Sequence, residues 1–220
     1  MRLRPYTTIL PKPLVPVGDR PILELIFAWL SNSGVSEVDV CIGHLGELIQ
    51  TYFSQAKTIP AGLEVRWRWE SEPLGTAGAL RYIPELEEAL LVLNGDILTD
   101  LDPTAMLDFH RASGAALTIA TRRAHVATEL GVIEHEAGLL TGYREKPVLE
   151  YSASMGIYVY EPRAVAMLPH GPCQFPELVL ALLAAGERVA AFETDAHWYH
   201  IGTPEQHVEA SRELGLHRIV

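Results

Sequence analysis

Three short segments of the chain combine a stiff or glycine-containing backbone with side chains that could bind phosphate or a metal ion. The first runs from Arg2 through Arg4 to Lys12, and prolines lie on both sides of the lysine. Prolines fix φ and remove backbone donors, so we expect this segment to be rigid and extended. Its cations could hold a polyphosphate. A solvated, proline-rich surface segment would have the same composition, and the residues alone do not decide between the two.

The second segment is a loop from Pro73 to Gly78, with Gly75 and Thr76 inside it. It follows residues 64–70, where apolar and polar side chains alternate as in a strand. Glycines let a backbone approach a flat ligand closely. The start of the helix expected after the loop offers free N–H groups to a ligand. An ordinary strand-to-helix turn is the alternative interpretation.

The third segment is Asn94-Gly95-Asp96, directly after an apolar stretch that ends at Leu93. A carboxylate at a strand end is suited to a hard cation such as Mg²⁺, which usually takes one or two protein carboxylates together with phosphate oxygens. The alternative is a turn in which the aspartate bonds its own backbone.

The elements that must position these segments alternate between strand and helix in the first half of the chain. This order predicts a parallel sheet with right-handed crossovers, and ligands of such sheets bind at the carboxyl ends of the strands. The second half adds strand-like stretches joined by turns, which indicates a mixed, partly antiparallel extension. We expect helices at 21–34, 46–54, 175–185 and 204–214, and strands at 38–42, 64–70, 89–93, 117–121, 131–135, 139–145 and 154–160.

Composition excludes several classes of protein. The chain has 220 residues, of which 48% are hydrophobic, and this excludes a disordered tail. A net charge of −11 argues against a partner that is a nucleic-acid backbone. No secretory signal or membrane-spanning stretch is found, so we expect no membrane partner. The two cysteines, Cys41 and Cys173, form no disulfide framework and fit the reducing cytoplasm, with Cys41 expected to be a buried small hydrophobe.

Taken together, the segments resemble the sugar-1-phosphate nucleotidylyltransferases, or NDP-sugar pyrophosphorylases. That family's signature, Gly-Gly-x-Gly-Thr-Arg-Leu-x-Pro followed by Pro-Lys-x-Leu-x-Pro-Val, matches residues 2–17 in its latter part. The base loop Pro-Leu-Gly-Thr-Ala matches residues 73–77, and the metal-binding aspartate of Asn-Gly-Asp matches Asp96. Further matches are Gly131, Glu145-Lys146-Pro147, residues 156–158 and residues 201–205, so the resemblance covers nearly the whole chain.

The resemblance implies an α/β, Rossmann-like, doubly wound mixed sheet with a small antiparallel sugar-binding extension. It implies one domain, residues 1–220, with a nucleotide-binding half (about 1–110) and a sugar-phosphate-binding half (about 111–220). It further implies that a sugar 1-phosphate attacks the α-phosphorus of a nucleoside triphosphate and that pyrophosphate leaves. No general base is needed, because a phosphate monoester is largely ionised near neutral pH.

The same resemblance assigns roles to individual residues. These are Arg2 and Lys12 as catalytic cations; Pro73, Gly75, Thr76 and Asn94 for the nucleotide; Gly131, Glu145, Lys146 and Ser154 for the sugar phosphate; and Asp96 with His200 for Mg²⁺, or Mn²⁺ as an alternative.

Three positions depart from the family's pattern. Met1 stands where the signature has its Thr, so the first strand and the glycine-rich loop are missing from this sequence, and we expect two inner sheet edges to be exposed. His200 replaces the usual second metal-binding Asp, and imidazole suits Zn²⁺ or Mn²⁺ better than Mg²⁺. A packed, non-ligating histidine is the alternative there. Ser154-Met155-Gly156 stands where many relatives have Asn-Ala-Gly, which leaves the sugar undecided.

Three functions therefore remain in view. The first is a cytoplasmic nucleotidylyltransferase, whose base loop looks most like guanylyltransferases that use mannose- or heptose-type phosphates. The second is a non-catalytic or regulatory homologue that binds a sugar nucleotide. The third is a general α/β ligand-binding domain. His197 and His200 are not expected to chelate a metal as a pair, because residues three apart in a strand point to opposite faces.

Overall fold

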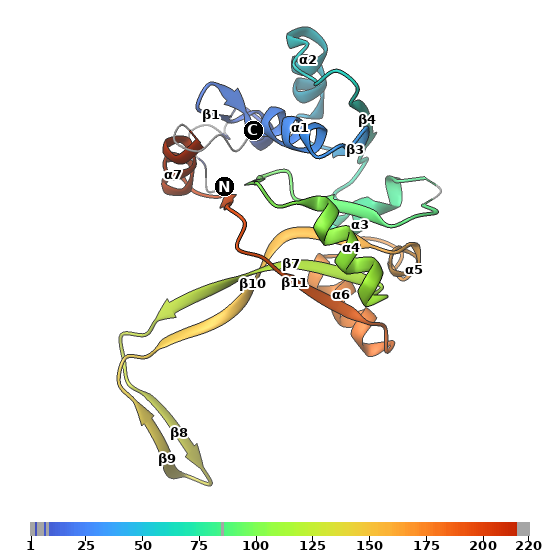
Figure 1. Ribbon diagram of the computed structural model, residues 1–220. Coiled ribbons are helices and arrows are strands. Elements are labelled where there is room, and N and C mark those ends of the chain that lie inside the picture. Colours follow the sequence, from blue (N-terminus) through green and yellow to red (C-terminus); the bar gives the residue numbers. More distant parts are fainter. Residues whose placement is uncertain (1–2, 4–6, 8, 85, 215–220) are drawn as a thin grey trace.

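The structure is a computed structural model that describes residues 3, 7, 9–84 and 86–214 (Figure 1). Its helices are α1 (Ile22–Asn32), α2 (Gly46–Ala56), α3 (Gly75–Gly78), α4 (Pro103–Ser113), α5 (Pro162–Val165), α6 (Phe175–Ala184) and α7 (Pro204–Leu214), with short 3-10 turns at Lys12–Leu14 and Ala79–Tyr82. Its strands are β1 (Pro16–Val17), β2 (Arg20–Pro21), β3 (Glu37–Ile42), β4 (Glu64–Trp69), β5 (Leu90–Leu93), β6 (Ile97–Thr99), β7 (Leu117–Ala127), β8 (Val132–Glu136), β9 (Leu139–Arg144), β10 (Val148–Tyr160), β11 (Val189–Glu193) and β12 (Trp198–His200). None of the described helices is long and apolar enough to cross a membrane.

Two strands, β3 and β4, and two helices, α1 and α2, form the part of the body that residues 22–69 build. β3 and β4 pair in parallel, with Val38 opposite Val65. The helices α1 and α2 pack on this pair through aromatic side chains: the Phe53 ring centroid lies 5.1 Å from that of Phe27 and 6.0 Å from that of Trp67. The apolar spacing of α1 and the alternation of β4 therefore predicted these elements correctly.

A four-stranded mixed sheet forms the rest of the body, in the order β11-β7-β10-β5. β11 runs parallel to β7, and β10 is antiparallel to both β7 and β5. Buried side chains of β7, β10 and α6, among them Leu117, Tyr160 and Leu182, form a second hydrophobic cluster beneath it. The expected α/β fold with a mixed sheet is confirmed.

A hollow of about 510 Å³ lies between β3 and β5 and is lined mostly by apolar side chains of both strands and of α1. In the described part of the chain β3 pairs only with β4, and β5 only with β10. An edge of each strand therefore faces the hollow, as expected. Cys41 of β3 also lines it and is half-buried, which corrects the expectation of a fully buried side chain. Burial raises the pKa of the Cys41 thiol to about 11. Cys173 is buried, and both cysteines are free thiols.

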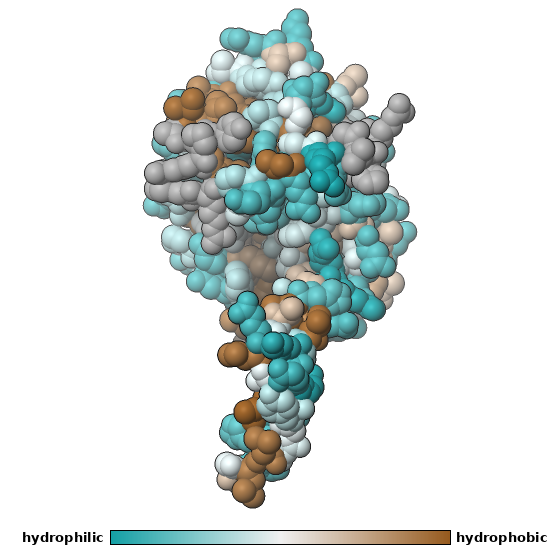
Figure 2. All heavy atoms as spheres, turned by 90° about the vertical axis from the view of Figure 1, so that its left-hand side faces the viewer, coloured by the Kyte–Doolittle hydropathy of each residue, from teal (hydrophilic) through white to brown (hydrophobic). Residues whose placement is uncertain are grey.

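A long arm, which we define as residues 124–151, extends from the body (Figure 1). It exists because β7 and β10 run further than expected and stay paired, with Val148 opposite Ala127. Beyond them β8 and β9 form an antiparallel hairpin. Apolar side chains gather at the tip and where the arm leaves the body (Figure 2). The exposed apolar residues of the arm are Val126, Leu130, Ile133, Leu139, Leu140, Tyr143, Val148 and Tyr151.

Candidate functional site

Three predicted residues from distant parts of the chain meet at one point. Lys12 lies in a short 3-10 turn whose flanking prolines fix its backbone. Asp96 lies between β5 and β6, and His200 ends β12, which pairs with β6. The Lys12 ammonium forms an ion pair with Asp96 Oδ2, and His200 Nε2 lies 3.4 Å from the same oxygen. We call these three residues the Asp96 cluster.

The second oxygen of Asp96 is buried, and among the described residues no donor reaches it. The side chain is 22% exposed. Its carboxylate contacts Lys12 and His200 rather than its own backbone, so the interpretation of Asp96 as a self-bonded turn residue is wrong.

The residues of the cluster fit a magnesium ion that also binds substrate. One carboxylate with a free oxygen, completed by phosphate oxygens, is the usual Mg²⁺ arrangement. In the part of the chain that the structure describes, no group of three or more His, Cys, Asp or Glu side chains could hold a metal ion by itself. His197 Nδ1 lies 2.7 Å from Asp100 Oδ2, so this ring pairs with a different carboxylate from the one beside His200.

A bend in β10 places two further predicted residues beside Asp96. The pairing of β10 with β7 is interrupted between Ser154 and Tyr158, and Gly156 takes a φ of +73° there. The Asn94 backbone N–H donates to the Gly156 carbonyl at 3.0 Å. The Gly156 N–H donates to Ser154 Oγ at 3.3 Å. A Cβ on Gly156 would lie 2.7 Å from Asn94 Nδ2, so glycine is required at this contact.

The loop at 73–78 is hydrogen-bonded to the segment that precedes α6. The Ala77 and Gly78 N–H groups both donate to the Cys173 carbonyl, at 3.0 and 3.1 Å. Thr76 Oγ1 accepts from the Phe175 N–H at 2.8 Å. The expectation of free N–H groups at this helix start is therefore wrong. The helix α3 is one turn long, and the Cys173 carbonyl accepts hydrogen bonds from two of its N–H groups.

Around the same loop the predicted nucleotide-binding residues are arranged as follows. Pro73 and Thr76 are exposed, and Gly75 is half-buried. Thr76 and Asn94 both line the hollow between β3 and β5, so the structure brings these two together. Their role toward a nucleotide stays a prediction.

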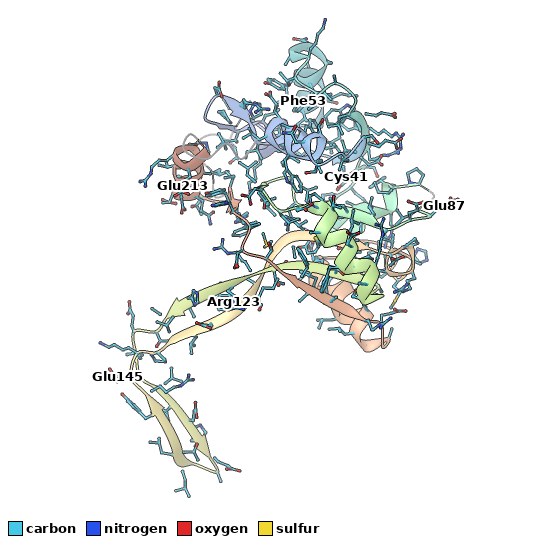
Figure 3. The ribbon with its side chains drawn as sticks, viewed as in Figure 1. Cys41, Phe53, Glu87, Arg123, Glu145 and Glu213 are labelled. Atoms are coloured by element: carbon cyan, nitrogen blue, oxygen red, sulfur yellow. The ribbon has the colours of Figure 1, made fainter. Side chains whose placement is uncertain are left out.

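The remaining predicted sugar-phosphate residues lie on the arm. Figure 3 shows Glu145 on the arm, away from the body that carries Asp96. The Tyr143 hydroxyl donates to Glu145 Oε2, and this bond raises the pKa of Tyr143. Gly131 is close to the same ring, since a Cβ added there would lie 2.3 Å from the Tyr143 oxygen. Lys146 follows with a φ of +41°. The structure therefore groups Gly131 and Glu145 around Tyr143 but does not bring them to the Asp96 cluster. Arg2, like Arg4, lies outside the described residues.

The sequence analysis missed two residues beside the cluster. The Trp198 ring stacks on His200, with centroids 6.1 Å apart, and its indole N–H donates to the Met155 carbonyl at 2.7 Å. The Arg122 guanidinium carbon lies 5.5 Å from the Trp198 ring centroid. Alternation along a strand places Trp198 and His200 on one side, which was a usable signal. Nothing in the sequence marked Arg122.

In this α/β body a lysine from a short turn meets a carboxylate that follows β5, and the carboxyl ends of strands are where open α/β sheets bind their ligands. The model of the family described as nucleotidyl transferase matches residues 1–215, so the chain belongs to the nucleotidyl transferase family. The expected relationship to sugar-1-phosphate nucleotidyltransferases is confirmed.

Two curated relatives and one solved structure illustrate the similarity. The chain is 29% identical over 213 residues to the mannose-1-phosphate guanyltransferase of Candida albicans, covering 93% of this chain and 59% of the relative. It is 30% identical over 237 residues to the UTP–glucose-1-phosphate uridylyltransferase of Synechocystis, covering 96% and 60%. The chain thus spans about 60% of the length of these relatives. The crystal structure of HddC from Yersinia pseudotuberculosis has the same fold, with a TM-score of 0.73, 23% identity, and coverage of 93% of this chain and 90% of that chain.

Proposed function

We propose that this chain transfers a nucleotidyl group from a nucleoside triphosphate to a sugar 1-phosphate in the cytoplasm. The Asp96 cluster is the observation that carries the proposal. It joins a cation for phosphate oxygens, a carboxylate with a free oxygen, and an imidazole at the carboxyl end of β5. The names of the relatives support the reaction class and suggest guanosine triphosphate with mannose 1-phosphate as the first pair to test.

The reaction we propose exchanges one phosphorus–oxygen bond for another. An oxygen of the sugar 1-phosphate forms a bond to the α-phosphorus, and the bond from the α-phosphorus to its bridging β-oxygen breaks. Pyrophosphate leaves with that oxygen and its electron pair. The attacking phosphate is largely ionised near neutral pH, so the chain needs to position and neutralise the reactants rather than remove a proton.

Lys12 is the residue we propose for the α-phosphate. Its ammonium is held against Asp96 by an ion pair, and both side chains are partly buried. An incoming triphosphate offers the lysine more negative charge than one carboxylate does, so Lys12 exchanges Asp96 for phosphate oxygens. Arg2, also proposed as a catalytic cation, would assist it.

Asp96 and His200 are the residues we propose beside Mg²⁺. The ion, when bound, neutralises charge on the phosphates, and Mn²⁺ is the alternative because imidazole suits it. Pro73, Gly75, Thr76 and Asn94 are proposed for the nucleotide, within residues 1–110. Ser154, and on the arm Gly131, Glu145 and Lys146, are proposed for the sugar phosphate, within residues 111–220. All belong to one proposed domain, residues 1–220.

Pyrophosphate release tests the proposal. The protein is incubated with Mg²⁺ and each pairing of GTP, UTP, ATP, CTP or dTTP with mannose 1-phosphate or glucose 1-phosphate. We expect release with at least one pairing, largest with GTP and mannose 1-phosphate. Release with none of them overturns the proposed function.

A non-catalytic role as a sugar-nucleotide-binding homologue is the second candidate. The observation in its favour is His200, which offers a neutral nitrogen where a second carboxylate would serve Mg²⁺ better. Calorimetry separates the two functions. Binding of GDP-mannose without pyrophosphate release from any pairing favours the second candidate, whereas turnover excludes it.

A further inference from the structure

The arm is a ribbon two strands wide that extends away from the body (Figure 1). Within the described residues, β8 and β9 pair only with each other, and the outer parts of β7 and β10 do the same. A ribbon of two strands is at best marginally stable in water, and a third strand or a packed layer is needed to stabilise it. The arm therefore lacks a covering layer in the single chain.

The base of the arm has one apolar face. In the pairing of β7 with β10, Val126 lies opposite Leu149, and Ala124 lies opposite Tyr151. Residues directly opposite one another on antiparallel strands share a face, and so do residues two apart on one strand. These four side chains therefore lie on one side of the ribbon and carry no charge. Val126 is 47% exposed and Tyr151 is 53% exposed.

The other face of the base carries charges that are already paired. The Arg123 guanidinium lies 2.8 Å from Glu193 Oε1, and His125 Nδ1 lies 3.7 Å from Glu150 Oε1. Val148 is on this second face as well, by the same register. A ribbon with water on both sides has no physical reason to keep one face apolar and the other charged, so the pattern indicates that the apolar face is covered.

The hairpin at the end of the arm repeats the pattern. Ile133 of β8 lies opposite Tyr143 of β9, on one face. Glu134 follows on the other face, where its Oε1 lies 3.5 Å from an Arg144 nitrogen. Leu140 is 64% exposed near the tip, where apolar side chains gather (Figure 2). Both parts of the arm thus expose apolar side chains beside paired charges.

The size of the apolar surface matches one side of a protein–protein interface. Covering one large apolar side chain removes about 60–120 Å² from water, so the side chains of these two faces together offer on the order of 500 Å². A stable interface covers about 800 Å² on each partner, and somewhat more than half of that is apolar.

Charge favours a second copy of this chain as the partner. Each copy has a net charge of −11, so two copies repel one another over most of their surfaces. The apolar face of the arm base carries no charge, and a contact through it brings no like charges together. In a two-fold dimer both copies use the same face, so one uncharged surface serves both sides of the contact.

We propose that the arms of two copies pack together through their apolar faces and join the copies as a two-fold dimer. The two ribbons then form two layers, and each supplies the cover that the other lacks. The inference does not depend on the proposed function, because the surface lies on the arm, away from the body that carries Asp96 (Figure 3).

Two valine variants on opposite faces of the arm test the dimer. Val126→Lys places a charge on the apolar face and Val148→Lys places one on the charged face, where the native valine is 60% exposed. Both variants move the net charge one unit toward zero, so increased repulsion between the copies cannot explain a loss of dimer. The association of each is measured by sedimentation equilibrium, with thermal melting of the same samples to show that the chain is folded.

We expect the wild type to dimerise with a Kd of about 10 μM or lower. Val126→Lys should raise that Kd at least about 100-fold, because the substitution occurs twice in a two-fold contact and each copy loses about tenfold. Tyr151→Lys, on the same face of the other strand, should do the same. Val148→Lys should keep the wild-type Kd within about threefold.

Hydrogen exchange locates the contact within the chain. In the wild type, amides of residues 124–151 should exchange more slowly at concentrations above the Kd than below it, and those of β4 should not change. In Val126→Lys the arm should exchange equally at both concentrations. A wild type that stays monomeric at about 100 μM overturns the proposal. A dimer that Val126→Lys leaves intact, or that both valine variants weaken equally, also overturns it.

Discussion

Replacement of Asp96 with Asn removes one charge from the centre of the candidate site and keeps the shape of the side chain. The amide oxygen can still accept from Lys12, but it no longer holds a metal ion or opposes a cation with full charge. The Asp96 carboxylate is 22% exposed and lies 3.4 Å from His200, so water screens it only in part. The substitution therefore tests charge, not packing.

The size of the effect follows from this partial burial. Two unit charges about 4 Å apart interact by about 4 kcal/mol at an effective dielectric constant of about 20. A tenfold change in rate corresponds to about 1.4 kcal/mol, so the loss of one such interaction from the transition state lowers turnover about 1000-fold. The folded state keeps its hydrogen bond to Lys12, and we expect the melting temperature to change by less than about 4 °C.

The assay is pyrophosphate release from GTP, mannose 1-phosphate and Mg²⁺, with calorimetric melting of the same samples. Asp100→Asn is the matched control, because Asp100 also pairs with a histidine, His197, at 2.7 Å but contacts neither Lys12 nor His200. We expect Asp100→Asn to retain most of the wild-type turnover. The reasoning is refuted if Asp96→Asn keeps more than a tenth of that turnover, or if both variants lose it equally.

Three further predictions concern single residues. Lys12→Ala should lower turnover at least about 100-fold, since the cation proposed for the α-phosphate is gone; an activity within threefold of the wild type would remove Lys12 from the mechanism. Gly156→Ala should cost about 1–3 kcal/mol of stability and lower the melting temperature, because φ is +73° and the new Cβ would lie 2.5 Å from Ile97 Cδ1. Gly95→Ala, with no atom within 4 Å of the added Cβ, is its control, and equal melting temperatures would contradict the argument. Burial raises the pKa of Cys41 from 9.0 to about 11, so the unfolded chain loses this proton first as the pH rises. The wild type should then lose up to about 1.4 kcal/mol of unfolding free energy per pH unit between pH 9 and 11 relative to Cys41→Ala, and parallel denaturation curves for the two would disprove the shift.

Elements with a strong local pattern were predictable, and elements defined by distant pairing were not. The apolar spacing of α1 and the alternation of β4 are properties of neighbouring residues, and both elements form where expected. β6 and β12 have three residues each, too few to show a period, and exist because they pair with one another. β7 and β10 exceed their predicted lengths because their backbone groups hydrogen-bond to one another along the arm, where side chains are exposed and show no buried face to predict a strand from.

The same distinction explains the candidate site. Asn94-Gly95-Asp96 was recognisable because a carboxylate follows an apolar strand directly. The free N–H groups expected after Gly75 were not free, since the Cys173 carbonyl accepts two of them. The Glu-Lys-Pro motif also identified Glu145 and Lys146, but it did not indicate that these residues lie on an arm away from Asp96. A motif identifies residues by their type and spacing. Whether those residues lie close together in space depends on how strands from distant parts of the chain pair.

The position of His200 beside Asp96 depends on the exact register in which β12 pairs with β6. In the register of β12 with β6, Trp198 lies opposite Thr99 and His200 lies opposite Ile97, next to Asp96. Two hydrogen bonds fix this register: the Thr99 hydroxyl donates to the His197 carbonyl at 2.7 Å, and the Ile201 N–H donates to the Asp96 carbonyl at 2.9 Å. A slip of one residue would turn both rings to the opposite face. It would separate His200 from Asp96 and Trp198 from Arg122 in one step, so the proposed metal-binding residues and the aromatic packing beside them depend on the same three-residue strand.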